Sequence, residues 1–313
     1  MISTYVETVL QLGALYGIVA IAVVVSFRFL SFPDLTIDGS FVLGGVLAAK
    51  GIISGYPLLA VTALAVGGGF LAGTGTATIH RILGINKFFA GILSAMVLYS
   101  VNLRLLSKAN LSVFGHPTIF SPFSTHAVWL TVACTVFLVA VVLLVALAFR
   151  TRPGLLIRGV GENPNVLRLG KGGAYLLVAI GLGASNALAA LAGALVVQYQ
   201  SFVDVNMGVG VTITGFAALF VGEAAIVVWG AVYRWISAER RWRWRRHLLQ
   251  VDGELLAAIC GSIGLTAATV ATLYIGLAPS DTKAISAIIL IVAMSIRRGR
   301  FSSILVPPSR FET

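Results

Sequence analysis

The stretch AVWLTVACTVFLVAVVLLVALAF, from Ala127 to Phe149, runs for 23 residues without a charged side chain. A transmembrane helix needs about 20 consecutive apolar residues, so this stretch predicts a membrane span. Eight further apolar runs lie at about 6–27, 38–53, 57–79, 88–103, 172–197, 208–233, 254–277 and 284–296. The chain therefore reads as a series of membrane-spanning helices.

The composition of the whole chain supports this interpretation. Of its 313 residues, 58% are hydrophobic and only 11% are charged, with a mean hydropathy of +0.98. A soluble protein carries about 25% charged residues. These values exclude a soluble enzyme, a disordered chain and a protein with a single anchor. At about 35 residues for a span with its loop, roughly nine spans are expected. We predict an all-α, polytopic membrane protein with about 8–10 transmembrane helices, forming one domain over residues 1–313.

The positive charges indicate the orientation. If successive runs cross the membrane in alternate directions, 18 Lys and Arg residues lie on one side and four on the other. Because cytoplasmic loops are enriched in Lys and Arg, the loaded side is the cytoplasm. This places the N-terminus outside and the C-terminus inside. Close Gly pairs such as Gly69 and Gly73 indicate tight helix packing.

Signatures of catalysis and of metal binding are missing from the sequence. No phosphate-binding loop, zinc-protease motif or nucleophile elbow occurs, and the four His residues are scattered. The two cysteines, Cys134 and Cys260, each lie in an apolar run and are expected to be small core residues without a disulfide. We predict no enzymatic activity, no metal site and no cofactor in this chain.

A polar stretch, Ser31-Phe-Pro-Asp-Leu-Thr-Ile-Asp-Gly-Ser40, interrupts the apolar background near the N-terminus. Pro33 ends any helix that enters from Phe29, so a broken or re-entrant segment is expected near 30–50. One interpretation is that Asp38 caps the helix that starts there, since Asp is a preferred cap. The other is that polar groups line a solvated cavity, where irregular backbone at membrane depth is tolerated.

The segment 150–171 is a second polar feature. It is basic and amphipathic, and Gly159-Val-Gly161 predicts a turn between two short helical pieces. It is either a solvated cytoplasmic loop that carries positive-inside charge or a docking element for a cytoplasmic partner.

The residues of four ordered segments resemble one family. The run Ser31 to Gly45 resembles the N-terminal signature of ABC-importer permeases of the tryptophan/tyrosine-type group, within the branched-chain amino acid and ribose permease superfamily. The loop containing Arg158-Gly-Val-Gly-Glu-Asn-Pro164 is similar to the superfamily's coupling segment. The stretches 205–223 and 276–287 match later parts of the pattern. The resemblance covers about residues 5–300.

This resemblance implies a multi-pass permease of the bacterial inner membrane that pairs with a second permease subunit. A homodimer is favoured over a heterodimer. A cytoplasmic ATPase would bind the ATP, and an external binding protein would deliver the solute. It implies ATPase coupling for six residues, Arg158, Gly159, Gly161, Glu162, Asn163 and Pro164. It favours a position along the translocation path for Thr36, Asp38 and Ser40. The same position is supported less strongly for Asn86, Asn102 and Glu223.

One segment departs from the family pattern. Residues 234–250 look like a basic, Arg- and Trp-rich cytoplasmic insertion in place of a short connection. Trp settles at headgroup depth and Arg is attracted to anionic lipid, so contact with membrane lipid or a partner is favoured over nucleic acid. The residues concerned are Trp235, Arg240, Arg241, Trp242, Arg243, Trp244, Arg245 and Arg246.

The predicted function is the permease subunit of an ATP-driven importer for a small polar solute, an amino acid in first place. A sugar or nucleoside permease of the same kind is one alternative. A stand-alone secondary transporter is another, in which Asp34, Asp38 or Glu223 would carry coupling protons. A membrane scaffold without a path is the third.

Overall fold

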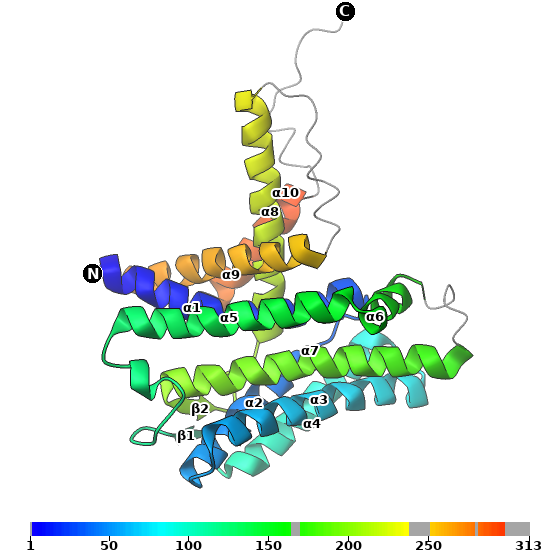
Figure 1. The fold of residues 1–313 in the computed structure, drawn as a ribbon, viewed down its shortest axis with the longest axis horizontal. Coiled ribbons are helices and arrows are strands. Elements are labelled where there is room, and N and C mark those ends of the chain that lie inside the picture. The colour runs from blue at the N-terminus through cyan, green and yellow to red at the C-terminus, as the bar shows by residue number, and fades with distance from the viewer. Residues whose placement is uncertain (1, 164–169, 238–250, 279–280, 298–313) are drawn as a thin grey trace, which may run out of the picture.

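A computed structural model describes residues 2–163, 170–237, 251–278 and 281–297 (Figure 1). Within these residues the chain is almost wholly helical. The helices are α1 (Ile2–Val23), the π-helical turn η1 (Val24–Phe29), α2 (Thr36–Ile53), α3 (Leu58–Leu83), α4 (Lys87–Leu106), the 3₁₀ turn η2 (Ser121–Phe123), α5 (Ala127–Arg150), α6 (Arg152–Glu162), α7 (Gly170–Gln200), α8 (Val211–Ser237), α9 (Val251–Tyr274) and α10 (Asp281–Arg297). Two short strands, β1 (Asn110–Ser112) and β2 (Phe202–Asp204), pair antiparallel.

The predicted membrane architecture is confirmed. Among the described residues, seven helices are long and apolar enough to cross a membrane, and α1 and η1 together form one of them, Ser3–Phe29. Helix α8 contributes a shorter apolar stretch, Val211–Ile226. The protein is therefore an all-α, multi-pass membrane protein.

The predicted interruption lies between η1 and α2. After Phe29 the chain leaves the helix, Ser31 adopts a left-handed conformation with φ of 50°, and α2 begins at Thr36. Asp34 accepts a hydrogen bond from the backbone N–H of Thr36 at 2.9 Å. This short turn leads the chain back into the interior of the protein, where Phe32 and Asp34 are buried.

The same break occurs a second time, after α7. Ser201-Phe-Val-Asp204 repeats the pattern of Ser31-Phe-Pro-Asp34, and Ser201 is again left-handed, with φ of 63°. Asp204 accepts a hydrogen bond from the N–H two residues later, that of Asn206, at 2.7 Å.

The helices that follow the two breaks also correspond. Helix α2 starts with Thr36-Ile-Asp-Gly and α8 with Thr212-Ile-Thr-Gly after its first residue. Helices α1 and α7 run in opposite directions (Figure 1). The chain thus contains two inverted halves, α1–α4 and α7–α10, with α5 and α6 between them, which is a common plan of membrane transporters.

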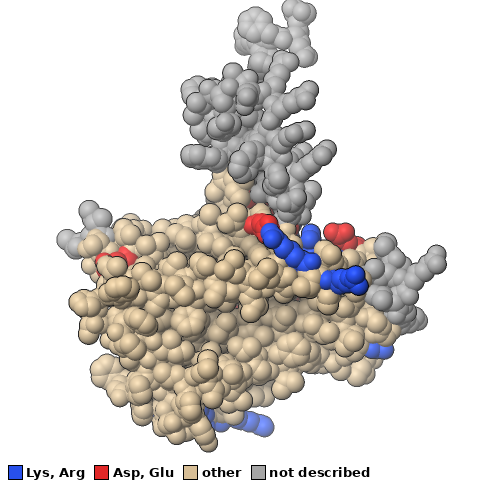
Figure 2. All heavy atoms as spheres, in the orientation of Figure 1, with Lys and Arg blue, Asp and Glu red and all other residues tan. Residues whose placement is uncertain are grey.

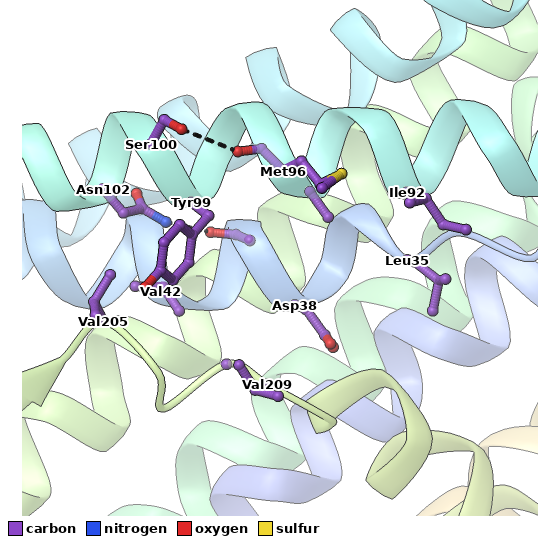
Figure 3. Close-up of a pocket in the computed structure, with 13 residues that line it drawn as sticks. Leu35, Asp38, Val42, Ile92, Met96, Tyr99, Ser100, Asn102, Val205 and Val209 are labelled. Carbon is purple, nitrogen blue, oxygen red and sulfur yellow. Dashed lines mark hydrogen bonds between the residues drawn. The ribbon is translucent and has the colours of Figure 1, made fainter.

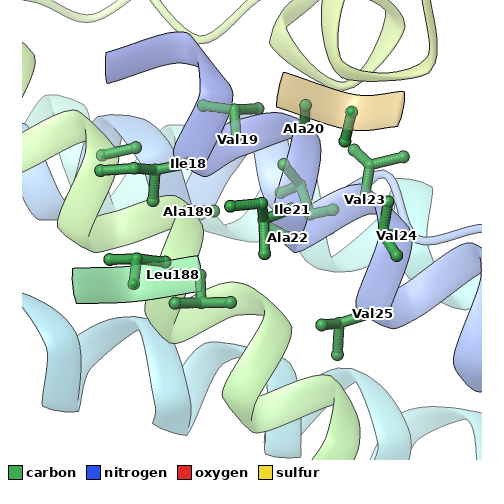
Figure 4. Packing of buried hydrophobic residues seen from close by; sticks show 14 of the residues in the cluster. Ile18, Val19, Ala20, Ile21, Ala22, Val23, Val24, Val25, Leu188 and Ala189 are labelled. Carbon is green, nitrogen blue, oxygen red and sulfur yellow. The ribbon is translucent and has the colours of Figure 1, made fainter. Parts of the chain in front are cut away.

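The core lies where the two long helices α1 and α7 meet. Ile18 to Val23 of α1 and the first two residues of η1, Val24 and Val25, are fully buried. They pack beside Leu188 and Ala189 of α7 (Figure 4). Helix α3 covers α7 on the other side. At Gly69 and Gly73 a Cβ atom would collide with the main-chain carbonyls of Asn186 and Leu182. The predicted role of these glycines in close packing is therefore confirmed.

The two ends of the molecule differ. In Figure 2 the side between them carries few charges, whereas Lys, Arg, Asp and Glu side chains gather at the end that holds α6. The strand pair β1–β2 lies at the opposite end (Figure 1). This distribution suits a bilayer around the middle of the molecule.

Three expectations need correction. Residues 152–162 form one helix and not two pieces separated by a turn at Gly159. Cys134 is buried as expected, but Cys260 is exposed on α9. The helix α8 continues through Ser237, so the first residues of the segment 234–250 belong to that helix, while 238–250 lie outside the described residues.

Candidate translocation site and coupling surface

Asp34 joins the first break to the centre of α7. Its side chain is 1% exposed, and its second carboxylate oxygen accepts a hydrogen bond from Asn186 Nδ2 at 2.7 Å. Asn186 in turn accepts one from Ser40 Oγ at 2.7 Å. Buried polar groups need hydrogen-bond partners, and these bonds provide them for the side chains of Asp34, Ser40 and Asn186. They also hold the start of α2 against α7.

Thr36 connects the start of α2 to α3 as well, because its hydroxyl lies 2.8 Å from that of Thr76 on α3. Thr36 and Ser40 are both fully buried, as is Thr76. Their hydroxyls are engaged in contacts between helices. The structure does not place Thr36 or Ser40 on the lining of the two cavities described below.

Asp38 caps a different helix from the one that the first of the two sequence interpretations suggested. It does not cap its own helix, which begins two residues earlier. Its carboxylate accepts hydrogen bonds from the N–H groups of Gly210 at 3.0 Å and Thr212 at 2.7 Å, and from the Thr212 hydroxyl at 2.6 Å. Asp38 therefore caps the N-terminus of α8, where unpaired N–H groups and the helix dipole favour a negative charge.

A cavity of about 500 Å³ opens beside this cap, between α2, α4 and the segment 205–209. Figure 3 shows Asp38 and Tyr99 pointing into the space between these elements. The other polar side chains on its lining are Ser100 and Asn102. Asn102 donates a hydrogen bond to the Gly39 carbonyl at 3.0 Å, while its own side-chain oxygen is buried without a partner among the described residues.

A second cavity, of about 430 Å³, lies on the other side of the same segment. It is lined by α1, the start of α8, α9 and α10, and Val209 borders both cavities. Its lining includes hydroxyl groups from Tyr16, Thr214, Thr266, Thr269, Thr282 and Ser286, and the ammonium of Lys283.

The two cavities carry opposite charges. Asp38 lines the first, and Lys283, in the first turn of α10, lines the second. The two are near enough for the Lys283 charge to act on the Asp38 carboxylate. Both cavities have the volume of a small-molecule site.

The remaining predicted path residues lie elsewhere. Asn86 is the N-cap of α4 and accepts a hydrogen bond from the Phe88 N–H at 2.9 Å. Glu223 forms an ion pair with Arg28 and lines neither cavity. Asn86 and Glu223 thus have structural partners, and of the six predicted path residues Asp38 and Asn102 face a cavity.

The predicted coupling segment is an amphipathic helix on the charged end of the molecule. Gly154, Ile157 and Val160 of α6 are buried, while Leu155 is 55% exposed. Glu162 and Asn163 are exposed at its end. Of the other predicted coupling residues, Arg158, Gly159 and Gly161 are partly buried, and Pro164 lies outside the described residues.

The Arg- and Trp-rich segment gives no geometry to report. Trp235 belongs to α8, and its side chain lies outside the described part of the structure. The other residues of the set lie entirely outside the described residues; they are Arg240, Arg241, Trp242, Arg243, Trp244, Arg245 and Arg246.

Sequence reasoning missed the partners of the two Asp residues. Asn186 interrupts the apolar run 172–197, and a polar side chain at membrane depth is a usable signal. Thr212 gives a weaker signal, because Thr is common in apolar helices. The repeated Ser-Phe-x-Asp would have pointed to the second break.

Comparison with known proteins places these features in context. Residues 5–294 match the family model described as branched-chain amino acid transport system, permease component. An uncharacterized protein of Rickettsia prowazekii is 37% identical over 202 residues, covering 64% of this chain and 70% of that protein. A tyrosine transport system permease protein of Clostridioides difficile is 31% identical over 216 residues, covering 69% and 72%.

A more distant relative is the galactofuranose transporter permease protein YtfT of Escherichia coli, 20% identical over 273 residues, covering 87% of this chain and 73% of that protein. No solved structure matches the chain.

Proposed function

The chain belongs to the family of permease components of branched-chain amino acid transport systems, and from this premise we propose that it is the membrane subunit of an ATP-driven amino acid importer. As a multi-pass permease of this family it resides in the membrane, which in bacteria is the inner membrane. The solute would pass from an external binding protein through the region of the two cavities.

The observation that carries the amino acid assignment is the pair of opposite charges beside the cavities. A free amino acid carries an ammonium and a carboxylate group, which match Asp38 and Lys283. The cavity volumes of about 500 and 430 Å³ suit a single small solute. The name of the Clostridioides difficile relative makes tyrosine the first solute to test.

Energy would come from a separate ATPase that docks on α6. This helix presents Leu155, Glu162 and Asn163 outward at the charged end, where an apolar contact and an acidic side chain are available to a partner. A second permease subunit, in a homodimer, would complete the path. The ATP would bind to the ATPase, so this chain needs no cofactor.

The test is reconstitution in vesicles with the partner ATPase and binding protein, which are to be sought among the genes next to that of this chain. We expect uptake of labelled L-tyrosine that requires ATP on the side of the membrane where the ATPase is bound. The uptake should stop when the ATPase is inactivated. Galactofuranose serves as the comparison solute. Uptake that follows a proton gradient without the ATPase would contradict the proposal and favour a secondary transporter.

A further inference from the structure

The turn η1 lies between the helix α6 and the helix α8, and it contacts both. It ends the first span with six π-helical residues, Val24 to Phe29. π-Helical turns are rare and frequently occur at functional sites. Its contacts on the two sides are of different kinds.

On the α6 side the contact is a close approach of the two main chains. A Cβ atom at Gly161 would collide with the carbonyl oxygen of Phe29 and the backbone of Leu30, so α6 touches the main chain at the end of η1. The guanidinium of Arg158 lies 5.5 Å from the centre of the Phe29 ring. That ring in turn contacts Phe149 of α5, with centroids 4.5 Å apart. A displacement of α6 therefore has to move the end of η1.

On the α8 side the contact is an ion pair that is flanked by aromatic side chains. Arg28 pairs with Glu223, and the side chains are only 20% and 17% exposed. The Arg28 guanidinium lies 5.8 Å from the ring centres of both Phe27 and Phe220. Phe27 also packs edge-on against Phe216, at 4.9 Å. Arg28 therefore ties η1 to the middle of α8.

A further carboxylate lies in the neighbourhood of the same pair. Glu254, near the start of α9, lies within the electrostatic reach of Arg28, Arg158 and Glu223. Charged groups from η1, α6, α8 and α9 are therefore near enough to influence one another. A largely buried ion pair such as this one is weak evidence for stability, because desolvation of both groups opposes their attraction. Stability of the fold alone therefore does not explain its presence here.

The chain beyond η1 reaches α8 once more. After the break at 30–35, α2 begins, and its Asp38 caps the start of α8. The segment 24–38 therefore holds α8 at two points, at its N-terminus through Asp38 and at its middle through Arg28. The start of α8 borders the second cavity.

We propose that η1 transmits the motion of α6 to α8, and that Arg28, through its ion pair with Glu223, is the positioning residue that makes this transmission effective. The inference rests on the proposed function, since it assumes that an ATPase moves α6. When α6 shifts, Gly161 displaces the end of η1, and the ion pair draws α8 with it. The segment between the two cavities then changes its position relative to α2.

The test replaces the ion pair by apolar residues of similar size, Arg28→Met with Glu223→Leu. Such replacements of buried pairs are commonly neutral or stabilising, so a merely structural pair predicts normal transport. A second variant exchanges the charges, Arg28→Glu with Glu223→Arg. The matched control is Gln11→Leu with Tyr199→Phe, with Gln11 in the first half of α1. It removes a partly buried polar contact of 2.8 Å between α1 and α7, together with the bonds that Gln11 donates to the Ala127 carbonyl and the Thr131 hydroxyl.

The measurement is L-tyrosine taken up per ATP hydrolysed, in vesicles with the ATPase and binding protein, together with the apparent melting temperature. We expect the apolar variant to keep its melting temperature and to lose at least tenfold in this ratio. The exchanged variant should regain half of the wild-type ratio or more, and the control should keep it.

Equal ratios in wild type and the apolar variant would overturn the inference while leaving the proposed function intact. If the apolar variant does not assemble, the exchanged variant decides, since a folded but uncoupled exchanged variant also overturns it. Absence of ATP-driven uptake by the wild type would instead overturn the proposed function.

Discussion

Replacement of Asp38 by Asn should destabilise the protein as well as impair transport. The carboxylate accepts three hydrogen bonds, two on Oδ1 from Thr212 and one on Oδ2 from the Gly210 N–H. An Asn side chain can keep the bonds to Thr212 through its oxygen, but its amide group then faces the Gly210 N–H as a second donor. The loss of this bond and of the negative charge costs about 1–3 kcal/mol.

The Ala variant provides the upper end of the series. It removes all three bonds and leaves the N–H of the fully buried Thr212 without its acceptor, which costs about 2–5 kcal/mol when several such bonds are lost. The order of apparent melting temperatures should be wild type, Asp38→Asn, Asp38→Ala. Asn86→Ala is the control, since it removes one exposed cap, of α4, worth about 1 kcal/mol.

Thermal unfolding of the purified protein in detergent, followed by intrinsic Trp fluorescence, measures this order. L-tyrosine uptake is compared per folded molecule. An Asp38→Asn variant that melts with the wild type would refute the capping role and leave Asp38 a residue of the path alone.

Three other predictions follow from the same structure. Asn186→Leu removes a hydrogen bond from the buried Asp34 carboxylate and should destabilise the protein by about 2–3 kcal/mol; a melting temperature equal to that of the wild type would show that Asp34 does not need this partner. Glu162→Lys should leave membrane insertion intact and weaken binding of the ATPase at least tenfold, measured by co-purification, since it reverses a charge at a docking surface; Glu7→Lys, at the other end of the molecule, is the control. Replacement of the insertion arginines by Gln should preserve assembly with the ATPase and abolish any dependence of uptake on anionic lipid in vesicles, because each Arg near the surface adds about 1 kcal/mol of attraction; equal lipid dependence in both proteins would reject lipid contact, and loss of the ATPase would indicate a second docking surface. The arginines are Arg240, Arg241, Arg243, Arg245 and Arg246.

The helices could be predicted because lipid leaves the backbone no other partners. A run such as 127–149 must satisfy its N–H and C=O groups internally, so a span is its only stable form. The break before Thr36 was also visible, since Pro33 and its polar neighbours cannot continue the first span.

The contacts of the charged residues could not be predicted in the same way. Thr212 is 174 residues from Asp38, and Glu223 is 195 residues from Arg28. Only the arrangement of the helices brings these residues together. The predicted turn within residues 152–162, which form the single helix α6, was wrong for a related reason. Gly159 and Gly161 disfavour a helix by about 1 kcal/mol each, and the close packing of Gly161 against η1 offsets this only in the folded protein.

The cap on α8 and a role in the translocation path are compatible for Asp38. The second half of the chain has a Thr at position 214 where the first half has Asp38, so α8 takes its capping carboxylate from the other half. Any movement of α8 away from α2 therefore breaks the bonds to Gly210 and Thr212. A carboxylate that has lost these donors needs a new partner, and the ammonium of an amino acid in the adjoining cavity is such a partner. In this way the solute would stabilise the state in which the cap is open, and the energy of solute binding would be coupled to the position of α8.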